Sequence, residues 1–369
     1  MGLQRLAWNY TGSTFDDRTY FTPPDQFYHV DHGSIPAPIA PESWTLQIAG
    51  RVAAPQTFTL ADLQSRIASR GITRYVKCLQ CLRDPLGDNV EKRWYASSGL
   101  WGGLPLAALL EEVGISPGST RIDYGGRDPS GFFASMPLDL ALCPPDGLPV
   151  LLATELNTAP LAHLRGGPVR VLVPNLLGFK SVKWVSWMCV TDAQVPNGWY
   201  ERGRGVRLPP GCKDPTLKTM ARIAPVLDAY GQPMHPRHSL FPCGRPLSFR
   251  GYAVPGPRGL AGVRFEVCRA GPARRALIDD GYACLEAPGN WGLPAPLPVG
   301  VVHFQGDRPD SWPLSYSWVY WQAGFGPLPP GRYRFAVWAV DHEGHEQPMP
   351  DPNEHSGSAR REQVVFRVS

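Results

Sequence analysis

The stretch Tyr75-Val-Lys-Cys-Leu-Gln-Cys-Leu-Arg-Asp-Pro-Leu-Gly87 decides the interpretation of this chain. Its first residues predict a β-strand, and Cys81 stands where a turn is expected to begin. Side chains alternate between the two faces of a strand, so residues three apart point in opposite directions. Cys81 is therefore expected on one face with Tyr75, Lys77 and Leu79. Cys78 is expected on the other face with Val76 and Gln80.

Cys78 and Cys81 form a Cys-x-x-Cys pair, a spacing that also occurs in zinc sites and redox pairs. The alternation along the strand instead favours one functional cysteine, Cys81, and one packed cysteine, Cys78. A soft thiolate is a good ligand for a metal that is already bound by sulfur. The alternative is that both cysteines are core residues.

The overall composition limits the class of protein. A chain of 369 residues predicts two domains, and 43% hydrophobic residues allow sizeable cores. The 41 prolines and 39 glycines suit a β-rich fold with many loops. The net charge of +4 without a long basic run argues against a nucleic-acid surface. No apolar run has the length of a membrane span.

The N-terminal residues and the cysteines bear on the compartment. The segment Met1-Gly-Leu-Gln-Arg-Leu-Ala-Trp-Asn9 lacks the apolar region of a signal peptide. We therefore expect a cytoplasmic protein, or a periplasmic one whose export signal has been removed. A disulfide framework is not expected in a chain of this size. Most of the eight scattered cysteines are expected to be buried small hydrophobic residues.

The first part of the chain, residues 1–222, has a mixed α and β pattern. Residues 1–43 predict an extended arm that lies over the body. Helices are predicted at 59–67, with Thr59 as N-cap, and at 105–114, with Pro in the first turn and Gly at the end. Strands are predicted at 44–50, 75–82, 169–174 and 182–190.

The second part, residues 223–369, has a different pattern. Alternating apolar and polar residues predict strands at 247–253, 262–268, 332–340 and 363–368. Gly/Pro turns separate these strands, which is typical of a β-sandwich of immunoglobulin type. The basic segment 196–222 is expected to cross between the two domains.

Two polar groups in the first part are candidate binding elements. Arg165, Arg170 and Lys183 flank Gly-rich turns, and guanidinium groups bind phosphate through paired hydrogen bonds. A solvated basic surface is the alternative. His29, Asp31 and His32 form a dense polar cluster that suits an organic ring system, although the histidines could also bind a metal.

Taken together, these motifs resemble those of the sulfite oxidase family of molybdopterin enzymes, from about residue 20 to the end. The matching segments of the first part are Phe21-Thr-Pro-Pro-Asp-Gln-Phe-Tyr-His-Val-Asp-His-Gly33, Leu79-Gln-Cys81, Trp101-Gly-Gly-Leu-Pro-Leu106, Ala134-Ser-Met-Pro-Leu138, Leu152-Ala-Thr-Glu-Leu-Asn157, Pro168-Val-Arg-Val-Leu-Val-Pro174 and Ser181-Val-Lys-Trp184. Gly251-Tyr-Ala253 and Ala339-Val-Asp-His-Glu-Gly-His-Glu-Gln-Pro348 resemble the dimerisation domain of that family.

The resemblance implies an α+β fold, with a molybdopterin-binding domain at 1–222 followed by an all-β immunoglobulin-like domain at 223–369. It implies a molybdenum atom held by one pyranopterin dithiolene and by Cys81, which is both metal ligand and catalytic residue. The cofactor does the hard chemistry, and the protein supplies orientation and electrostatics. The residues expected to bind this cofactor are Tyr28, His29, Asp31, His32, Cys81, Asp128, Ser135, Arg165, Arg170, Ser181, Lys183 and Trp184.

The function implied is oxygen-atom transfer on sulfite or another small sulfur oxyanion or sulfoxide-like substrate. Electrons would pass to an external acceptor such as a cytochrome, and the protein could be a homodimer. Val30 stands where the family has an arginine of the anion pocket, so weak sulfite oxidation with a high KM is expected. The alternative function is a non-catalytic binding or assembly protein that keeps the fold without an active metal.

Overall fold

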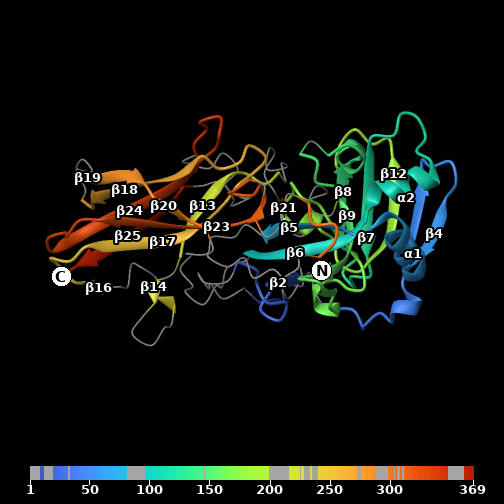
Figure 1. Ribbon diagram of the computed structural model, residues 1–369, viewed down its shortest axis with the longest axis horizontal. Coiled ribbons are helices and arrows are strands. Elements are labelled where there is room, and N and C mark those ends of the chain that lie inside the picture. Colours follow the sequence, from blue (N-terminus) through green and yellow to red (C-terminus); the bar gives the residue numbers. More distant parts are fainter. Residues whose placement is uncertain are drawn as a thin grey trace, which may run out of the picture.

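The computed structural model describes most of the chain. The described residues are 9–11, 20–31, 34–80, 96–144, 146–198, 216–224, 226–227, 233–234, 240–271, 276–287, 298–302, 304–305, 308–309, 311–347 and 361–369. They form mostly β-structure with few helices. Figure 1 shows two halves along the long axis, which we call the first half (residues 9–198) and the second half (residues 216–369).

The first half contains two main sheets. One has the strand order β10-β9-β6-β5, with β11 also paired to β9. Its strands are β5 (Thr73–Gln80), β6 (Ala96–Pro105), β9 (Leu151–Leu156), β10 (Ala159–Pro160) and β11 (Arg170–Leu172). The pairs are antiparallel, and β6 is buried along all its length except Pro105.

The other sheet of the first half has the order β4-β3-β12-β7-β8. Its strands are β3 (Thr45–Gly50), β4 (Gln56–Thr59), β7 (Arg121–Gly126), β8 (Phe133–Pro137) and β12 (Val185–Thr191). Strands β12 and β3 run parallel, and the other pairs are antiparallel. The two sheets share one hydrophobic core, to which β3, β7 and β12 contribute from one side and β6, β9 and β11 from the other.

Short elements complete the first half. They are the strands β1 (Asn9–Thr11) and β2 (His29–Asp31), the helices α1 (Leu60–Arg70), α2 (Leu106–Val113) and α3 (Leu138–Leu142), and the 3-10 turns η1 (Pro41–Ser43), η2 (His163–Arg165) and η3 (Gly178–Lys180).

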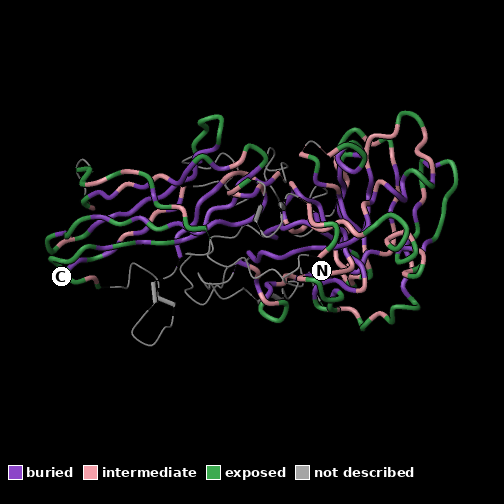
Figure 2. The backbone as a smooth tube through the Cα atoms, in the orientation of Figure 1, coloured by how far each residue is buried: buried purple, intermediate pink, exposed green. Residues whose placement is uncertain are grey.

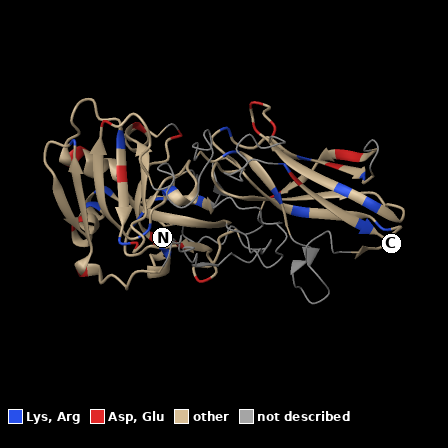
Figure 3. Ribbon diagram, turned by 180° about the vertical axis from the view of Figure 1, so that it is seen from behind, with Lys and Arg blue, Asp and Glu red and all other residues tan. Residues whose placement is uncertain are grey.

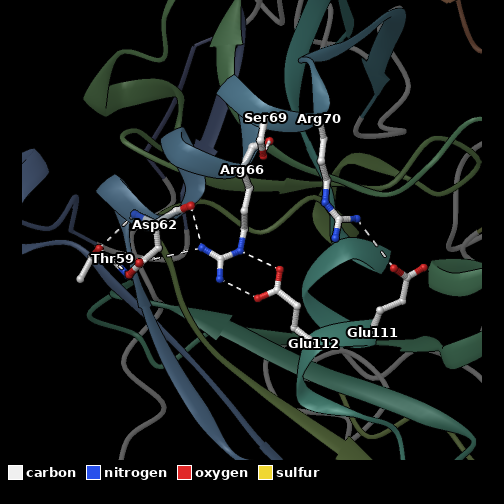
Figure 4. A network of polar contacts seen from close by, with 7 residues as sticks. All are labelled: Thr59, Asp62, Arg66, Ser69, Arg70, Glu111 and Glu112. Carbon is white, nitrogen blue, oxygen red and sulfur yellow. Dashed lines mark hydrogen bonds and ion pairs between the residues drawn. The ribbon is translucent and has the colours of Figure 1, made fainter.

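The start of α1 follows from a local sequence signal. Thr59 and Asp62 form a capping box, in which the Thr59 hydroxyl accepts from the Asp62 backbone N–H and the Asp62 carboxylate accepts from the Thr59 N–H. Figure 4 shows this box and the ion pair that ties α1 to α2. Arg66 donates to Glu112 through two hydrogen bonds of 2.8 and 2.6 Å.

The second half is built from two antiparallel sheets whose inner faces share a core. One sheet has the order β13-β17-β23-β20 and the other β16-β25-β24-β18-β19, where the single parallel pair is β16 with β25. The strands are β13 (Met220–Ile223), β16 (Leu240–Phe241), β17 (Leu247–Val254), β18 (Gly262–Arg269), β19 (Leu277–Tyr282), β20 (Cys284–Glu286), β23 (Val319–Phe325), β24 (Gly331–Val340) and β25 (Glu362–Val368).

Two-residue strands form two small additional pairs in the second half. They are β14 (Val226–Leu227) with β15 (Pro233–Met234), and β21 (Phe304–Gln305) with β22 (Arg308–Pro309). The central strands of both halves are largely buried in Figure 2. In Figure 3 the basic and acidic residues are interspersed over both halves.

Strand β5 lies where the two halves meet, and segments of the second half cover its outer edge. The Arg74 N–H donates to Gly300 O at 2.7 Å, and Arg74 O accepts from the Val302 N–H at 2.7 Å. Further along, the Cys78 N–H donates to Tyr316 O at 2.6 Å. Val76 and Cys78 also share a core cluster with residues of β17 and β23. The strand that precedes Cys81 is therefore hydrogen-bonded on both edges.

Most of the predicted elements are present, with changes at their ends. Pro105 is the N-cap of α2 rather than part of its first turn. Strand β11 spans only 170–172, and β12 begins at Val185 because Val182–Trp184 lie in the bend after η3. The immunoglobulin type of the second half and the division at residue 222 stay predictions, and residue 222 falls within β13.

Replacing Thr59 by alanine tests the capping box. We expect Thr59→Ala to lower the free energy of unfolding by about 1 kcal/mol, because an orphan N–H of the first turn loses its acceptor. Ser69→Ala, at the other end of α1, is the control and should not destabilise, since alanine is the better helix former. Urea unfolding followed by circular dichroism measures both. Equal effects of the two changes would contradict the role given to Thr59.

Candidate functional site

A pocket in the first half collects residues from separate elements of the chain. The described residues that line it are Tyr28, His29, Val30, Leu79, Asp128, Phe132, Leu164, Arg165, Arg170, Gly178, Phe179, Ser181, Val182, Lys183 and Trp184. The lining includes Leu79 at the end of β5 and several residues of the 178–184 segment after β11. The pocket therefore depends on how these two segments are held together.

Two arginines of the pocket are buried and anchored by backbone carbonyls. Arg165 donates from Nε to Pro24 O at 2.9 Å and from Nη2 to Asp25 O at 3.3 Å. Arg170 donates from Nη1 to Arg165 O and from Nη2 to Ser181 O. The side chains are only 5% and 6% exposed, so these residues do not form a solvated basic surface.

Lys183 is the third cation of the pocket. Its ammonium donates to Val30 O at 3.0 Å and forms an ion pair with the Asp31 carboxylate. Burial lowers the pKa of Lys183, and the Asp31 carboxylate opposes that shift. Burial also lowers the pKa of His29, and the positive charges of Lys183 and Arg165 lower it further. The pocket thus combines three cations with two carboxylates, the buried Asp31 and the lining residue Asp128.

Local backbone conformation brings Lys183 close to Arg165. Gly166 follows Arg165 and has φ +98°, a region that favours glycine. A Cβ at residue 166 would lie 2.8 Å from the side chain of Lys183, so a larger residue would displace that lysine. Trp184 is fixed by a hydrogen bond from Nε1 to His163 O at 2.8 Å, and the Lys183 ammonium lies 4.6 Å from its ring centroid.

The structure brings together most of the residues that the sequence predicts for cofactor binding. Tyr28, His29, Asp128, Arg165, Arg170, Ser181, Lys183 and Trp184 line the pocket. Asp31 joins it through Lys183. Ser135 does not belong to the described lining, and its hydroxyl accepts from Arg121 Nε at 3.0 Å. Cys81 and His32 lie outside the described residues.

Strand β5 confirms the predicted alternation as far as it is described. Tyr75 and Leu79 belong to one core cluster, whereas Val76 and Cys78 belong to another. Burial raises the pKa of the Cys78 thiol to about 12, so this cysteine is a neutral packed side chain. The expectation that most cysteines are buried is wrong for the described ones. Cys143, Cys243 and Cys284 are exposed, since they lie after α3, in a surface turn and on the edge strand β20.

Sequence reasoning missed a set of residues around the pocket. Its apolar lining includes Leu79, Phe132 and Phe179, which nothing in the sequence distinguishes from ordinary core residues. It also missed two fully buried lysines, Lys77 and Lys180. Lys180 donates to Ser135 O at 2.8 Å. The available signal for Lys77 was a lysine between the apolar residues Val76 and Cys78 of a strand, because lysine is rarely buried without partners.

The described residues contain neither a cluster of metal-ligating side chains nor a membrane-spanning helix. No group of three or more His, Cys, Asp or Glu side chains within them could hold a metal ion. No helix within the same residues has the length and apolar character needed to cross a membrane.

Comparisons with known proteins identify the first half. Residues 32–199 match the model of the oxidoreductase molybdopterin-binding domain. The mitochondrial sulfite oxidase of Drosophila melanogaster is 30% identical over 193 residues, and the sulfite oxidase of Gallus gallus is 30% identical over 195 residues. The first half therefore contains a molybdopterin-binding oxidoreductase domain that is similar to sulfite oxidases. This match supports the predicted molybdenum–molybdopterin cofactor.

The sequence matches cover only part of each protein. The two alignments include 49% of this chain, and they include 33% of the Drosophila protein and 42% of the Gallus protein. An inducible nitrate reductase (NADH) of Glycine max is 28% identical over 202 residues, which is 51% of this chain and 22% of that one. The family therefore includes proteins named for different substrates.

A solved structure extends the likeness to the second half of the chain. The sulfane dehydrogenase SoxCD from Paracoccus pantotrophus superposes with a TM-score of 0.67, covering 100% of this chain and 88% of that chain. At 18% identity this likeness establishes the fold alone. Both halves thus follow an architecture that occurs in a solved structure.

The buried Lys77 generates a pH-dependent contribution to stability. Burial lowers its pKa from 10.5 to about 7, so between these values the unfolded chain holds a proton that the folded chain lacks. The free energy of unfolding should then rise with pH, by up to about 1.4 kcal/mol per pH unit. We expect the stability of wild type minus that of Lys77→Met to increase from pH 7 to pH 9. Urea unfolding of cofactor-free protein at both pH values measures it, and a constant difference would contradict the shift.

Proposed function

We propose that the chain oxidises a small sulfur oxyanion or sulfoxide-like substrate at a molybdenum–molybdopterin cofactor bound in this pocket, with Cys81 as the metal ligand. One observation carries the proposal. The buried Arg165 and Arg170 and the partly buried Lys183, which come from different segments, converge on one pocket beside the end of β5. A site of this kind suits an anionic group that carries a phosphate.

The described residues fit such a group. Arg165 Nη1 is a buried donor that has no hydrogen-bond partner among the described residues, although Nε and Nη2 of the same side chain are bonded. A buried donor without a partner costs roughly 1–3 kcal/mol. An anion bound in the pocket would supply the acceptor. The glycine at 166 leaves room for Lys183 beside it, as a phosphate site requires.

Each side chain has a definable role in holding this group. Arg165, Arg170 and Lys183 would bind its phosphate and polar edge, and Tyr28, His29, Asp31 and His32 would contact its ring system. Asp128, Ser181 and Trp184 would complete the set. The cofactor, when bound, supplies two-electron redox chemistry for oxygen-atom transfer. Phe132, Phe179 and Leu79 would exclude water, which strengthens the electrostatic contacts inside the pocket.

The substrate class follows from the charge at the mouth of the pocket. Val30 is an apolar lining residue at the position where the resemblance expects an arginine. A doubly charged sulfite would meet one cationic partner fewer than in a pocket with arginine at this position. A less charged sulfur substrate should therefore bind better relative to sulfite. We further propose an external electron acceptor such as a cytochrome, a homodimer, and a cytoplasmic or periplasmic location.

Elemental analysis of two cysteine variants tests the metal ligand. Expressed in a host that makes the pterin, wild type and Cys78→Ser should contain molybdenum and turn over sulfite with ferricyanide. Cys81→Ser should fold but lose turnover, because an alcohol is a poorer ligand than a thiolate for this metal. Cys78→Ser should lose only about 1–3 kcal/mol of stability, the cost of burying a hydroxyl.

The outcomes of this experiment separate the candidate functions. Absence of molybdenum in the wild type would favour a non-catalytic binding or assembly protein. Loss of activity in Cys78→Ser but not in Cys81→Ser would overturn the assignment of the ligand.

Substitution of Val30 by arginine tests the substrate class. A new guanidinium in the pocket should lower KM for sulfite about tenfold, the effect of one charge-assisted hydrogen bond, with a smaller change in kcat. Val30→Leu is the apolar control and should leave KM for sulfite unchanged or higher. Steady-state kinetics with ferricyanide measures both variants. An unchanged KM in Val30→Arg would mean that the pocket serves a substrate without a strong negative charge.

A further inference from the structure

Lys77 is a fully buried lysine that lies behind the pocket. It is 0% exposed and is not among the described residues that line the cavity. Its ammonium donates to the carbonyl oxygens of Pro174 and, at 3.3 Å, of Leu176. Both carbonyls belong to the segment that leads from β11 into the pocket residues Gly178 and Phe179. The side chain therefore ties β5 to the segment that leads into the pocket residues 178–184.

The backbone of Lys77 makes a second connection to the pocket. Its carbonyl accepts a hydrogen bond from Trp101 Nε1 at 3.2 Å. The guanidinium of Arg170 lies 5.2 Å from the centroid of the Trp101 ring, a distance typical of a cation–π contact. One residue of β5 thus contacts the 174–176 segment directly and a pocket cation through Trp101.

Tyr316 brings the second half of the chain to the same lysine. The Lys77 ammonium lies 5.7 Å from the centroid of the Tyr316 ring. The Tyr316 hydroxyl donates a hydrogen bond to the Asp146 carboxylate. The Tyr316 carbonyl accepts a hydrogen bond from the N–H of Cys78, which follows Lys77 in β5. Tyr316 is fully buried and has φ +60°, which costs energy in a bulky residue. This conformation persists because contacts from both halves hold it.

We propose that Lys77 is a positioning residue that fixes the spacing between β5 and the segment that leads into the pocket residues 178–184, with Tyr316 of the second half holding it in place. The inference rests on the proposed function, because it names what keeps that site in shape. Lys77 acts through the 174–176 carbonyls and through Trp101, and not by contact with substrate. The second half thereby takes part in forming a site whose described lining comes from the first half.

The chemistry of the position favours this role over simple packing. Burial of an amine is unfavourable, and an apolar side chain of similar volume often serves the fold equally well. An amine, by contrast, can donate to two carbonyls at once, whether it is charged or neutral. Without those donors, two carbonyls of the 174–176 segment would face an apolar side chain. That segment should then open more readily, while the rest of the fold is kept.

Hydrogen exchange on cofactor-free protein tests the hydrogen bonds from Lys77 to the 174–176 segment, and it does not depend on catalysis. In Lys77→Met, amides of residues 175–183 should exchange about tenfold faster than in wild type, because the segment loses two hydrogen bonds. Phe335→Leu is the control, since it weakens the core of the second half without contacting β5. It should lower Tm and leave exchange at 175–183 unchanged. Equal exchange at 175–183 in Lys77→Met and wild type would overturn the proposal.

The loaded protein supplies the second measurement. After extended dialysis, Lys77→Met should retain less molybdenum than wild type and Phe335→Leu, and its KM for sulfite should rise about tenfold with a smaller change in kcat. Lys77→Gln keeps two N–H donors and should restore most of the retention. If Lys77→Met does not fold, Lys77→Gln is compared with wild type instead. Faster amide exchange at 175–183 and weaker retention of molybdenum in Lys77→Gln would then support the proposal.

The outcomes distinguish this proposal from the proposed function. A wild type without molybdenum would overturn the function and leave the exchange measurement valid. A loaded wild type from which Lys77→Met differs in neither exchange nor retention would overturn the positioning role alone.

Discussion

Burial of positive charge is the constraint on which the rest of this site depends. Arg165 and Arg170 are buried and Lys183 is partly buried at one pocket, which is costly unless each charge finds partners. The partners are mainly backbone carbonyls, those of Pro24, Asp25, Val30, Arg165 and Ser181, with the Asp31 carboxylate as the exception. Carbonyls orient a cation without neutralising it. The pocket therefore keeps a net positive character that carboxylate partners would have removed.

Carbonyl partners also explain why the segments around the pocket need rigid support. A carbonyl can hold a guanidinium only if its own backbone is fixed, and the segments 24–31 and 174–184 contain little regular structure. The support comes from β5, which is paired with β6 on one edge and bonded to residues 300–302 and 316 on the other. The second half thus stabilises the pocket indirectly, because its backbone forms hydrogen bonds with the outer edge of the strand that precedes Cys81.

The parts of the structure that follow from local sequence signals were predictable. The N-cap at Thr59 and the alternation of Tyr75 to Leu79 depend only on neighbouring residues, and both occur as expected. The association of Arg165, Arg170 and Lys183 could be anticipated from their motifs. By contrast, the roles of Lys77, Phe132 and Phe179 arise from packing between distant segments. The exposure of Cys143 and Cys284 depends on which strands and turns lie at the surface, and a single sequence does not contain that information.

Residue 30 illustrates how the fold separates the cofactor site from the choice of substrate. Lys183 binds residue 30 through its carbonyl oxygen, an atom that every amino acid provides. A change of side chain at this position therefore leaves the anchor of Lys183 in place. The same residue lines the pocket, so its side chain can alter the charge that a substrate meets. Because backbone and side chain serve different tasks here, the scaffold can keep one cofactor site while the identity of residue 30 adapts it to another substrate.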